Sequence, residues 1–427
     1  MFKMRLNLLL LCVLILLSGC AVTETGDTVG TEGTMGTEGG SQEADYRTEF
    51  TDSELAEGYA SFAVSEHLVV DAEITPYDKY ADGLNSYYMT QCYEEGDVGD
   101  AESFLEEATI FGRQQDEFWE LFSDASGVGI SRSILEYGMT ESYGYAFNEG
   151  LTGENGLGYF VLMNWMSFGA GVWEPHAYYP MVSLVVSEED NPAVQGSYDT
   201  YIMKSVLDYG GELAFADSTS LAAELKGTLE ELTGRRISDV WDCVAVTNEA
   251  VSTYAALEDG FEEYYCFYFY YDLDGLGIED LSLSYEMQDG ESCTDGARYS
   301  TLDESSVLVS LNEVAQVVAV GESGILWMQI SSGRDKGGVY KEGLSVVPPS
   351  ELLATVKEYY DTQLLVEDVT ITQVRLVYSG YFTDGADGEI DNAFRPFWKV
   401  QAYDANEGSR RTFVFDAVSG ELLSGVS

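Results

Sequence analysis

The chain has 427 residues, and 45% of them are hydrophobic, so it can bury a core and is long enough for two or three domains. It carries 75 acidic and 20 basic residues, which gives a formal net charge of −55. That charge excludes nucleic acid as a partner, and also simple adsorption to anionic lipid, because both repel a polyanion.

The N-terminus is predicted to be a secretory signal peptide over residues 1–19. Two basic residues precede an apolar run over residues 8–17, which is too short to cross a bilayer, since crossing takes about 20 apolar residues. Residues 17–20 read Leu-Ser-Gly-Cys, which resembles the bacterial lipobox. The resemblance implies that Cys20 is lipidated and holds the mature protein on the outer face of the cell membrane.

The remainder is predicted to contain a tether and three domains. Residues 20–46 are rich in Gly, Thr and Glu and lack large apolar side chains, which is typical of a flexible segment. We expect an N-terminal α+β domain over residues 47–240, a central β-rich domain over 241–345 and a C-terminal domain over 346–427.

The expected N-terminal domain shows both periodicities. Leu68, Val70, Ala72 and Ile74 alternate with polar residues, which predicts a half-buried strand that ends before Pro76. Apolar spacing predicts helices over residues 102–122 and 220–233, and β-rich runs predict strands over 156–168 and 179–186. For the second helix, Ser218 or Ser220 is the expected N-cap and Gly234 the expected end.

The two later domains are predicted to be built around strands. In the central one, strands are expected over residues 264–271, 281–285, 313–320 and 324–330, with a turn over 272–275. In the C-terminal one, a helix over 350–360 precedes strands over 369–378, 394–403 and 411–415, and a hairpin turn at Ser419-Gly420. The predicted fold class is α+β, with antiparallel sheets and packed helices, ending in a helix on an antiparallel meander.

Two motifs near the C-terminus point to a family. Residues 396–400 read Pro-Phe-Trp-Lys-Val, and residues 416–421 read Asp-Ala-Val-Ser-Gly-Glu. They resemble the end of PepSY-type domains, where a Pro-x-Trp-x-Val strand precedes an Asp-Ala-x-x-Gly-Glu hairpin. Over residues 321–423 the layout is similar to the YycH/YycI regulatory proteins of Gram-positive bacteria and to uncharacterised clostridial lipoproteins. YycH and YycI carry a transmembrane helix, whereas this chain has a predicted lipid anchor. The likeness therefore implies a fold more than a function.

Catalytic signals are weak. His67 and His176 are the two histidines, and neither lies in a Gly-x-Ser-x-Gly, Ser-x-x-Lys or His-Glu-x-x-His pattern. Trp165, Trp173 and Trp241 could stack on sugars, but packing in a core or loop is the more common role of such residues. Pairs of carboxylates carry no information in a chain with 75 acids.

A calcium site is the one metal site that the sequence suggests. Asp384, Asp387, Glu389 and Asp391 offer hard oxygen ligands within a single Gly-rich segment. Their spacing differs from that of an EF-hand, so a solvated hairpin loop is the favoured interpretation. The acidity of the chain has three explanations: a solvated surface that resists aggregation, adaptation to high salt, or attraction of cations such as Ca²⁺ or basic peptides. No other cofactor is expected.

Four cysteines remain as disulfide candidates after the signal peptide and Cys20. They are Cys92, Cys243, Cys266 and Cys293. Outside the cytoplasm they allow three pairings, and free buried thiols are the alternative. None has the Cys-x-x-Cys spacing of a zinc ribbon.

These observations favour a lipid-anchored, non-enzymatic binding or regulatory protein that works through contacts with a membrane or envelope protein. A hydrolase acting on envelope glycans or peptides is the second hypothesis. A solute-binding lipoprotein is the third, although the βαβ alternation of such lobes is not evident in the sequence.

Overall fold

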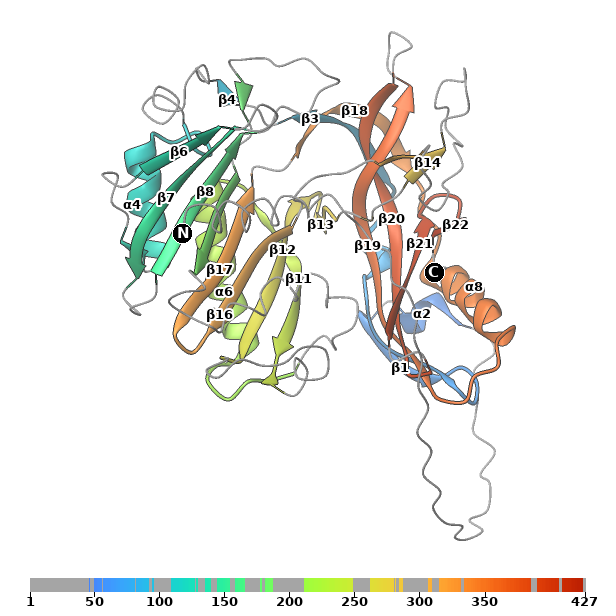
Figure 1. The fold of residues 1–427 in the computed structure, drawn as a ribbon. Coiled ribbons are helices and arrows are strands. Elements are labelled where there is room, and N and C mark those ends of the chain that lie inside the picture. Colours follow the sequence, from blue (N-terminus) through green and yellow to red (C-terminus); the bar gives the residue numbers. More distant parts are fainter. Residues whose placement is uncertain are drawn as a thin grey trace. The chain divides into compact units, whose positions relative to one another are not determined.

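The longest strands of this computed structural model belong to an eight-stranded sheet (Figure 1). Its main order is β1-β2-β19-β20-β21-β22, and β3 joins it through β20 and pairs in turn with β18. The strands are β1 Tyr59–Ala63, β2 Leu68–Ile74, β3 Leu84–Gln91, β18 Arg334–Leu344, β19 Val369–Asp384, β20 Ile390–Asp404, β21 Ser409–Asp416 and β22 Leu422–Ser424.

The structure describes residue 46, the segments 50–55, 57–80, 82–91, 109–126, 211–248, 262–279, 315–331, 334–384, 390–406 and 409–424, and shorter stretches between them. The shorter stretches are 94–95, 128–129, 135–139, 144–153, 158–165, 177–178, 181–186, 281, 284–286 and 306–308. The predicted signal peptide, Cys20 and almost all of the predicted tether lie outside these residues.

The second large sheet runs in the order β11-β12-β16-β17-β10-β8-β7-β5, with β13 beside β12 and β6 beside β7. Its strands are β5 Val128–Gly129, β6 Leu135–Met139, β7 Gly144–Gly153, β8 Gly158–Trp165, β10 Met181–Val186, β11 Ile237–Val246, β12 Tyr264–Leu273, β13 Leu276–Gly277, β16 Ala315–Gly321 and β17 Gly324–Ser331. Two small ladders pair β4 Glu94–Glu95 with β9 Ala177–Tyr178, and β14 Ser284–Glu286 with β15 Ser306–Leu308.

The described part of the chain is mostly strand and also contains helices, so the predicted mixed α+β class is confirmed. The helices are short. They are α2 Asp52–Leu55, α4 Gln115–Ser126, α6 Ser218–Thr233, α8 Pro349–Asp361 and the single 3₁₀ turn η1 Tyr77–Tyr80. Over the residues that the structure describes, no helix combines the length and the apolar character that a membrane crossing requires.

The sheets are not purely antiparallel, which corrects the prediction. β2 and β19 pair in parallel, with Leu68 opposite Val369 and Val70 opposite Ile371. A hairpin forces neighbouring strands to run antiparallel, but no hairpin joins these two. Almost 300 residues separate them in the chain, so their relative direction comes from the long connection.

The alternating strand is confirmed, whereas one helix differs from the prediction. In β2, Leu68, Val70, Ala72 and Ile74 are all buried. A helix is predicted over residues 102–122; in the described part of that segment, residues 109–122, it begins at Gln115, because Phe111 and Gly112 take positive φ angles of 50° and 72° and reverse the chain. Residues 96–108 lie outside the described segments.

Helix α6 corrects the predicted N-cap and confirms the predicted C-terminal end. Its N-cap is Asp217, whose carboxylate accepts a hydrogen bond from Ser220 N at 2.8 Å; neither predicted serine takes that role. Gly234 ends the helix in the left-handed region, with φ 67°, as predicted.

The borders of the sheets do not coincide with the domain limits expected near residues 240 and 345. The eight-stranded sheet combines β1 and β2 with β19–β22. The second sheet combines β8 and β10 with β12, β16 and β17. Buried side chains from both sheets also form one continuous hydrophobic cluster.

Helix α8 packs on the C-terminal strands, and Figure 1 shows it beside β21 and β22. Its Tyr359 and Tyr360 rings meet Phe413 of β21 edge-on, with centroids 5.2 and 5.9 Å away. Trp398 of β20 is fully buried, and its indole Nε1 donates a hydrogen bond to Val347 O at 3.0 Å, just before the helix. The tryptophan therefore joins the sheet to the start of α8.

The hairpin turn after β21 depends on Asp416 and Gly420. Asp416 Oδ1 accepts hydrogen bonds from the backbone N–H groups of Val418 and Ser419, both at 2.8 Å. Gly420 has a φ of 74°, and its N–H donates to Asp416 O at 2.9 Å. The acid and the glycine of the motif are thus both required by the geometry of the turn.

Replacing either turn residue should cost a modest, measurable amount of stability. We expect Asp416→Ala to lower the free energy of unfolding by about 1–3 kcal/mol, because it removes the acceptor of two backbone donors and the partner of Arg395 Nη2, which lies 2.7 Å from Asp416 Oδ2. Gly420→Ala should cost about 1 kcal/mol through its positive φ alone, since an added Cβ would meet Val347 at an ordinary 3.6 Å. Chemical denaturation measures both, and equal stability of wild type and Asp416→Ala would contradict this account of the turn.

Candidate functional site

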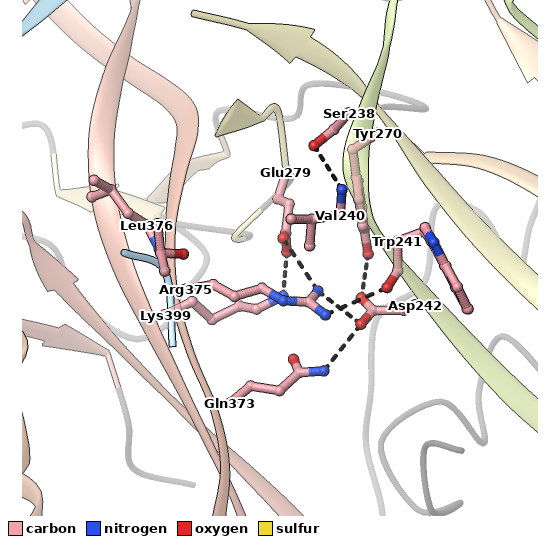
Figure 2. A network of polar contacts seen from close by, with 11 residues as sticks. Ser238, Val240, Trp241, Asp242, Tyr270, Glu279, Gln373, Arg375, Leu376 and Lys399 are labelled. Atoms are coloured by element: carbon pink, nitrogen blue, oxygen red, sulfur yellow. Dashed lines mark hydrogen bonds and ion pairs between the residues drawn. The ribbon is translucent and has the colours of Figure 1, made fainter. Parts of the chain in front are cut away.

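The most concentrated set of ionisable groups lies where the two sheets meet. Asp242 is on β11, Glu279 is two residues after β13, Arg375 is on β19 and Lys399 is on β20. Figure 2 shows the four side chains converging from both sides of this junction. All four residues are buried.

Arg375 is at the centre of the cluster. Its Nη1 donates to Asp242 Oδ1 at 2.8 Å and lies 3.9 Å from Glu279 Oε1. Lys399 Nζ donates to Glu279 Oε2. Two neutral side chains complete the surroundings of Asp242, with donor–acceptor distances of 2.7 Å from Tyr270 OH and 3.2 Å from Gln373 Nε2.

The electrostatics of the cluster favour a structural role. Burial by itself lowers the pKa of Arg375, but the charges of Asp242 and Glu279 outweigh it and leave that pKa above its ordinary value. Burial, and then the Asp242 charge, raise the pKa of Tyr270, so its hydroxyl stays protonated and donates. Two anions and two cations lie together here, so their charges offset one another, and removing one partner would leave an uncompensated buried charge.

A second group of polar contacts lies at the turn between β12 and β13. Asp274, with a positive φ of 54°, accepts hydrogen bonds from Tyr87 OH of β3 and, at 3.1 Å, from Lys336 Nζ of β18. Lys336 Nζ also lies 4.9 Å from the centroid of the Tyr87 ring. Asp274 is therefore engaged by a lysine and a tyrosine of the eight-stranded sheet.

An exposed loop over residues 362–368, between α8 and β19, has the opposite character. Leu364 is 93% exposed and Val366 is 69% exposed, the two highest values among the described large apolar residues. Leu365, between them, packs against the core. The two exposed apolar side chains therefore flank one that is partly buried.

One side chain holds the loop in place. Asn406 Oδ1 accepts hydrogen bonds from Val366 N at 2.9 Å and Glu367 N at 2.7 Å, and its Nδ2 donates to Glu367 O at 2.9 Å. Asp404 Oδ1 positions the asparagine by accepting from its backbone N and from Nδ2, at 2.9 and 3.0 Å. The exposed apolar side chains thus rest on a preformed backbone.

The predicted calcium ligands are only partly described. Asp384 ends β19 and Asp391 is in β20, on paired strands. Asp387 and Glu389 lie outside the described residues. In the part of the chain that the structure describes, no three His, Cys, Asp or Glu side chains are grouped so that they could hold a metal ion.

The described cysteines cannot bond to each other. Val244, not Cys243, lies opposite Cys266 on the paired strands β11 and β12. Directly opposed residues share a face and successive residues alternate, so the two thiols point to opposite faces of the sheet. Cys243 carries a free, buried thiol. Pairings that involve Cys92 or Cys293 lie outside the described residues and stay predictions.

The Cys243 thiol is expected to be inert. Burial, and then the nearby Cys266 and Glu212, raise the pKa of Cys243 well above the usual range of a thiol, so almost no reactive thiolate exists at pH 8. Native protein treated with iodoacetamide at pH 8 should remain unmodified at Cys243, whereas denatured protein should be modified. Peptide mass spectrometry reads both, and rapid native labelling of Cys243 would contradict this prediction.

The remaining sequence candidates fall in ordinary surroundings. His67 Nδ1 lies 3.1 Å from Asp368 Oδ1 at the surface, with no described nucleophile next to it. Trp241 is partly buried and packs on Phe267, with ring centroids 5.8 Å apart. His176 and Trp173 lie outside the described residues, as does the side chain of Trp165.

The sequence did not reveal the residues of the buried charge cluster or the exposed apolar residues of the loop. Asp242, Glu279, Arg375 and Lys399 are scattered over 158 positions, and the clearest available sign was a basic residue within an otherwise apolar strand. Leu364 and Val366 were overlooked because an apolar residue in a loop is usually unremarkable.

Comparisons with known proteins show a distant structural likeness and no family. No protein-family model matches it, and no curated protein sequence matches it. Among solved structures, it is similar to an uncharacterized protein from Eubacterium rectale, with a TM-score of 0.49 and 14% sequence identity over 87% of this chain and 97% of that chain. No family is assigned on this basis.

Proposed function

We propose that the protein is a non-enzymatic, surface-anchored binding or regulatory protein that acts through protein contacts outside the membrane. The carrying observation is the preformed loop, whose backbone N–H groups at Val366 and Glu367 donate to Asn406 Oδ1 while Leu364 and Val366 stay exposed to solvent. The largest group of charges, around Arg375, is by contrast buried and internally neutralised. Rigid, exposed apolar side chains suit contact with another protein better than they suit chemistry.

The C-terminal segment is proposed to be a PepSY-type module like that of the YycH/YycI regulators. Helix α8 on strands β19–β22 agrees with this layout, and Trp398 and Asp416 each have a structural role that explains the motif residues. The protein would then be a lipoprotein counterpart of those regulators, held by lipid on Cys20 on the outer face of the cell membrane. Any signal would pass through a membrane or envelope partner.

Affinity isolation of the full-length protein, from cells cross-linked before lysis, tests the proposal. We expect the same membrane or envelope protein to be recovered repeatedly, and to be depleted with Cys20→Ser, which removes the predicted lipid attachment. Recovery of no partner in repeated isolations would count against protein contacts. Turnover of purified peptidoglycan or of a glycan panel would favour the hydrolase hypothesis instead.

A further inference from the structure

We infer that the loop over residues 362–368 is the docking surface of this protein, and that it fits a partner protein with an apolar pocket flanked by lysine or arginine side chains. The inference rests on the proposed function and names its surface. Three observations lead to it: the exposure of two neighbouring apolar side chains, the hydrogen bonds that hold them, and the charge around them.

The two most exposed apolar side chains of the described residues lie close together in the chain. Leu364 and Val366 are separated by one residue and point outwards together, while Leu365 anchors the loop in the core. Single exposed apolar residues are common on protein surfaces and need no explanation. Two that are separated by one residue, on a backbone that the Asn406 side chain fixes, form a small preorganised apolar feature.

The backbone around this feature is fixed at both ends. Besides the bonds from Asn406, Gln363 N donates to Tyr360 O at 3.0 Å and Ala405 N donates to Asp368 O at 3.1 Å. Val369 N then donates to His67 O at 2.8 Å, which ties the end of the loop to the turn between β1 and β2. A partner would pay little conformational entropy to order the loop, and that favours binding.

The charge around the loop is negative. Glu367 and Asp368 follow Val366 directly, and the exposed Glu66 precedes His67 on the neighbouring turn. Two cations of neighbouring elements are engaged: Lys357 of α8 pairs with Asp361, and Arg411 Nη1 of β21 donates to Tyr359 OH at 2.5 Å. An apolar feature edged by carboxylates complements an apolar pocket edged by basic groups.

Photocrosslinking of the full-length protein in producing cells tests the inference. A Leu364→p-benzoylphenylalanine variant should give a discrete protein adduct, whereas a Val339→p-benzoylphenylalanine variant should not; Val339 is 44% exposed on β18, which makes it a matched control. Mass spectrometry should place the adduct on an apolar patch with lysine or arginine beside it.

Binding of the purified partner provides the second measurement. Leu364→Ser/Val366→Ser should weaken binding roughly tenfold or more, whereas Val240→Ser/Val339→Ser, at the two other valines exposed in the described part of the chain, should change it less than about twofold. Glu66→Gln/Glu367→Gln should weaken binding at low salt and matter less at high salt. Thermal melting checks that all variants remain folded.

Each contrary result is distinct. Adducts with lipid alone at Leu364 would mean that the loop inserts into the bilayer, and the inference would be wrong. Adducts with a protein from Val339 but not from Leu364 would place the docking surface elsewhere and leave the proposed function intact. Absence of protein adducts from either position, together with failed affinity isolation, would remove both the inference and the proposed function.

Discussion

Arg375→Met is expected to lower the free energy of unfolding by about 3–5 kcal/mol, the largest effect of any single charge in the described structure. The substitution keeps most of the length of the side chain but removes its charge. Asp242 then loses its ion pair with Arg375, and Glu279 keeps the one with Lys399. Both carboxylates are buried, so water cannot replace the lost interaction.

Chemical denaturation of residues 45–427, which form a compact unit by themselves, measures this loss. Lys226→Met is the matched control, because its partner Asp239 is 83% exposed and the pair should contribute less than about 1 kcal/mol. Asp242→Leu/Arg375→Met should cost less than Arg375→Met alone, because no unpaired charge remains on Asp242. If Arg375→Met were no more costly than Lys226→Met, the junction would not depend on this ion pair.

Trp398→Ala is expected to cost about 3–5 kcal/mol and to loosen helix α8 from the sheet. The indole is among the largest fully buried side chains, and it both fills space under the helix and bonds to Val347 O. Trp398→Phe keeps most of the volume and removes the hydrogen bond, so it should cost about 1–2 kcal/mol. The difference between the two variants separates packing from hydrogen bonding.

Hydrogen exchange shows whether the loss is local. Amides of α8, over Pro349–Asp361, should exchange faster in Trp398→Ala than in wild type, whereas amides of β12 should be little changed under native conditions. Trp241→Ala, at a tryptophan that is only partly buried, is the control and should affect stability less and leave α8 protected. Equal protection of α8 in Trp398→Ala and wild type would mean that the indole does not hold the helix.

The elements that were predicted well depend on neighbours in the chain. The alternation of β2, the apolar stripe and Gly234 end of α6, the break at Pro348–Pro349 before α8, and the turn at Asp416 and Gly420 all lie within a few residues. The hydrophobic period and the backbone preferences of glycine and proline act over that range. The start of α4 was predicted wrongly, because the positive φ of Phe111 has no sequence signal of its own.

The candidate functional residues were much harder to predict. Arg375 and Asp242 are 133 residues apart, and Lys399 and Glu279 are 120 apart. In a chain with 75 acids, no spacing distinguishes the two carboxylates that become buried. The asparagine that holds the exposed loop is 39 or 40 residues from the groups it bonds.

The sequence by itself determined part of the secondary structure, such as β2, α6 and α8, and it predicted a lipid anchor at Cys20, because such signals are read from residues close together. Only the tertiary structure decided that β2 runs parallel to β19, that Cys243 and Cys266 face opposite ways, and that Leu364 and Val366 stay in solvent while Leu365 is partly buried. Pairing direction, strand register and exposure are set by the packing of distant segments, where one residue of shift exchanges the buried and exposed faces of a strand.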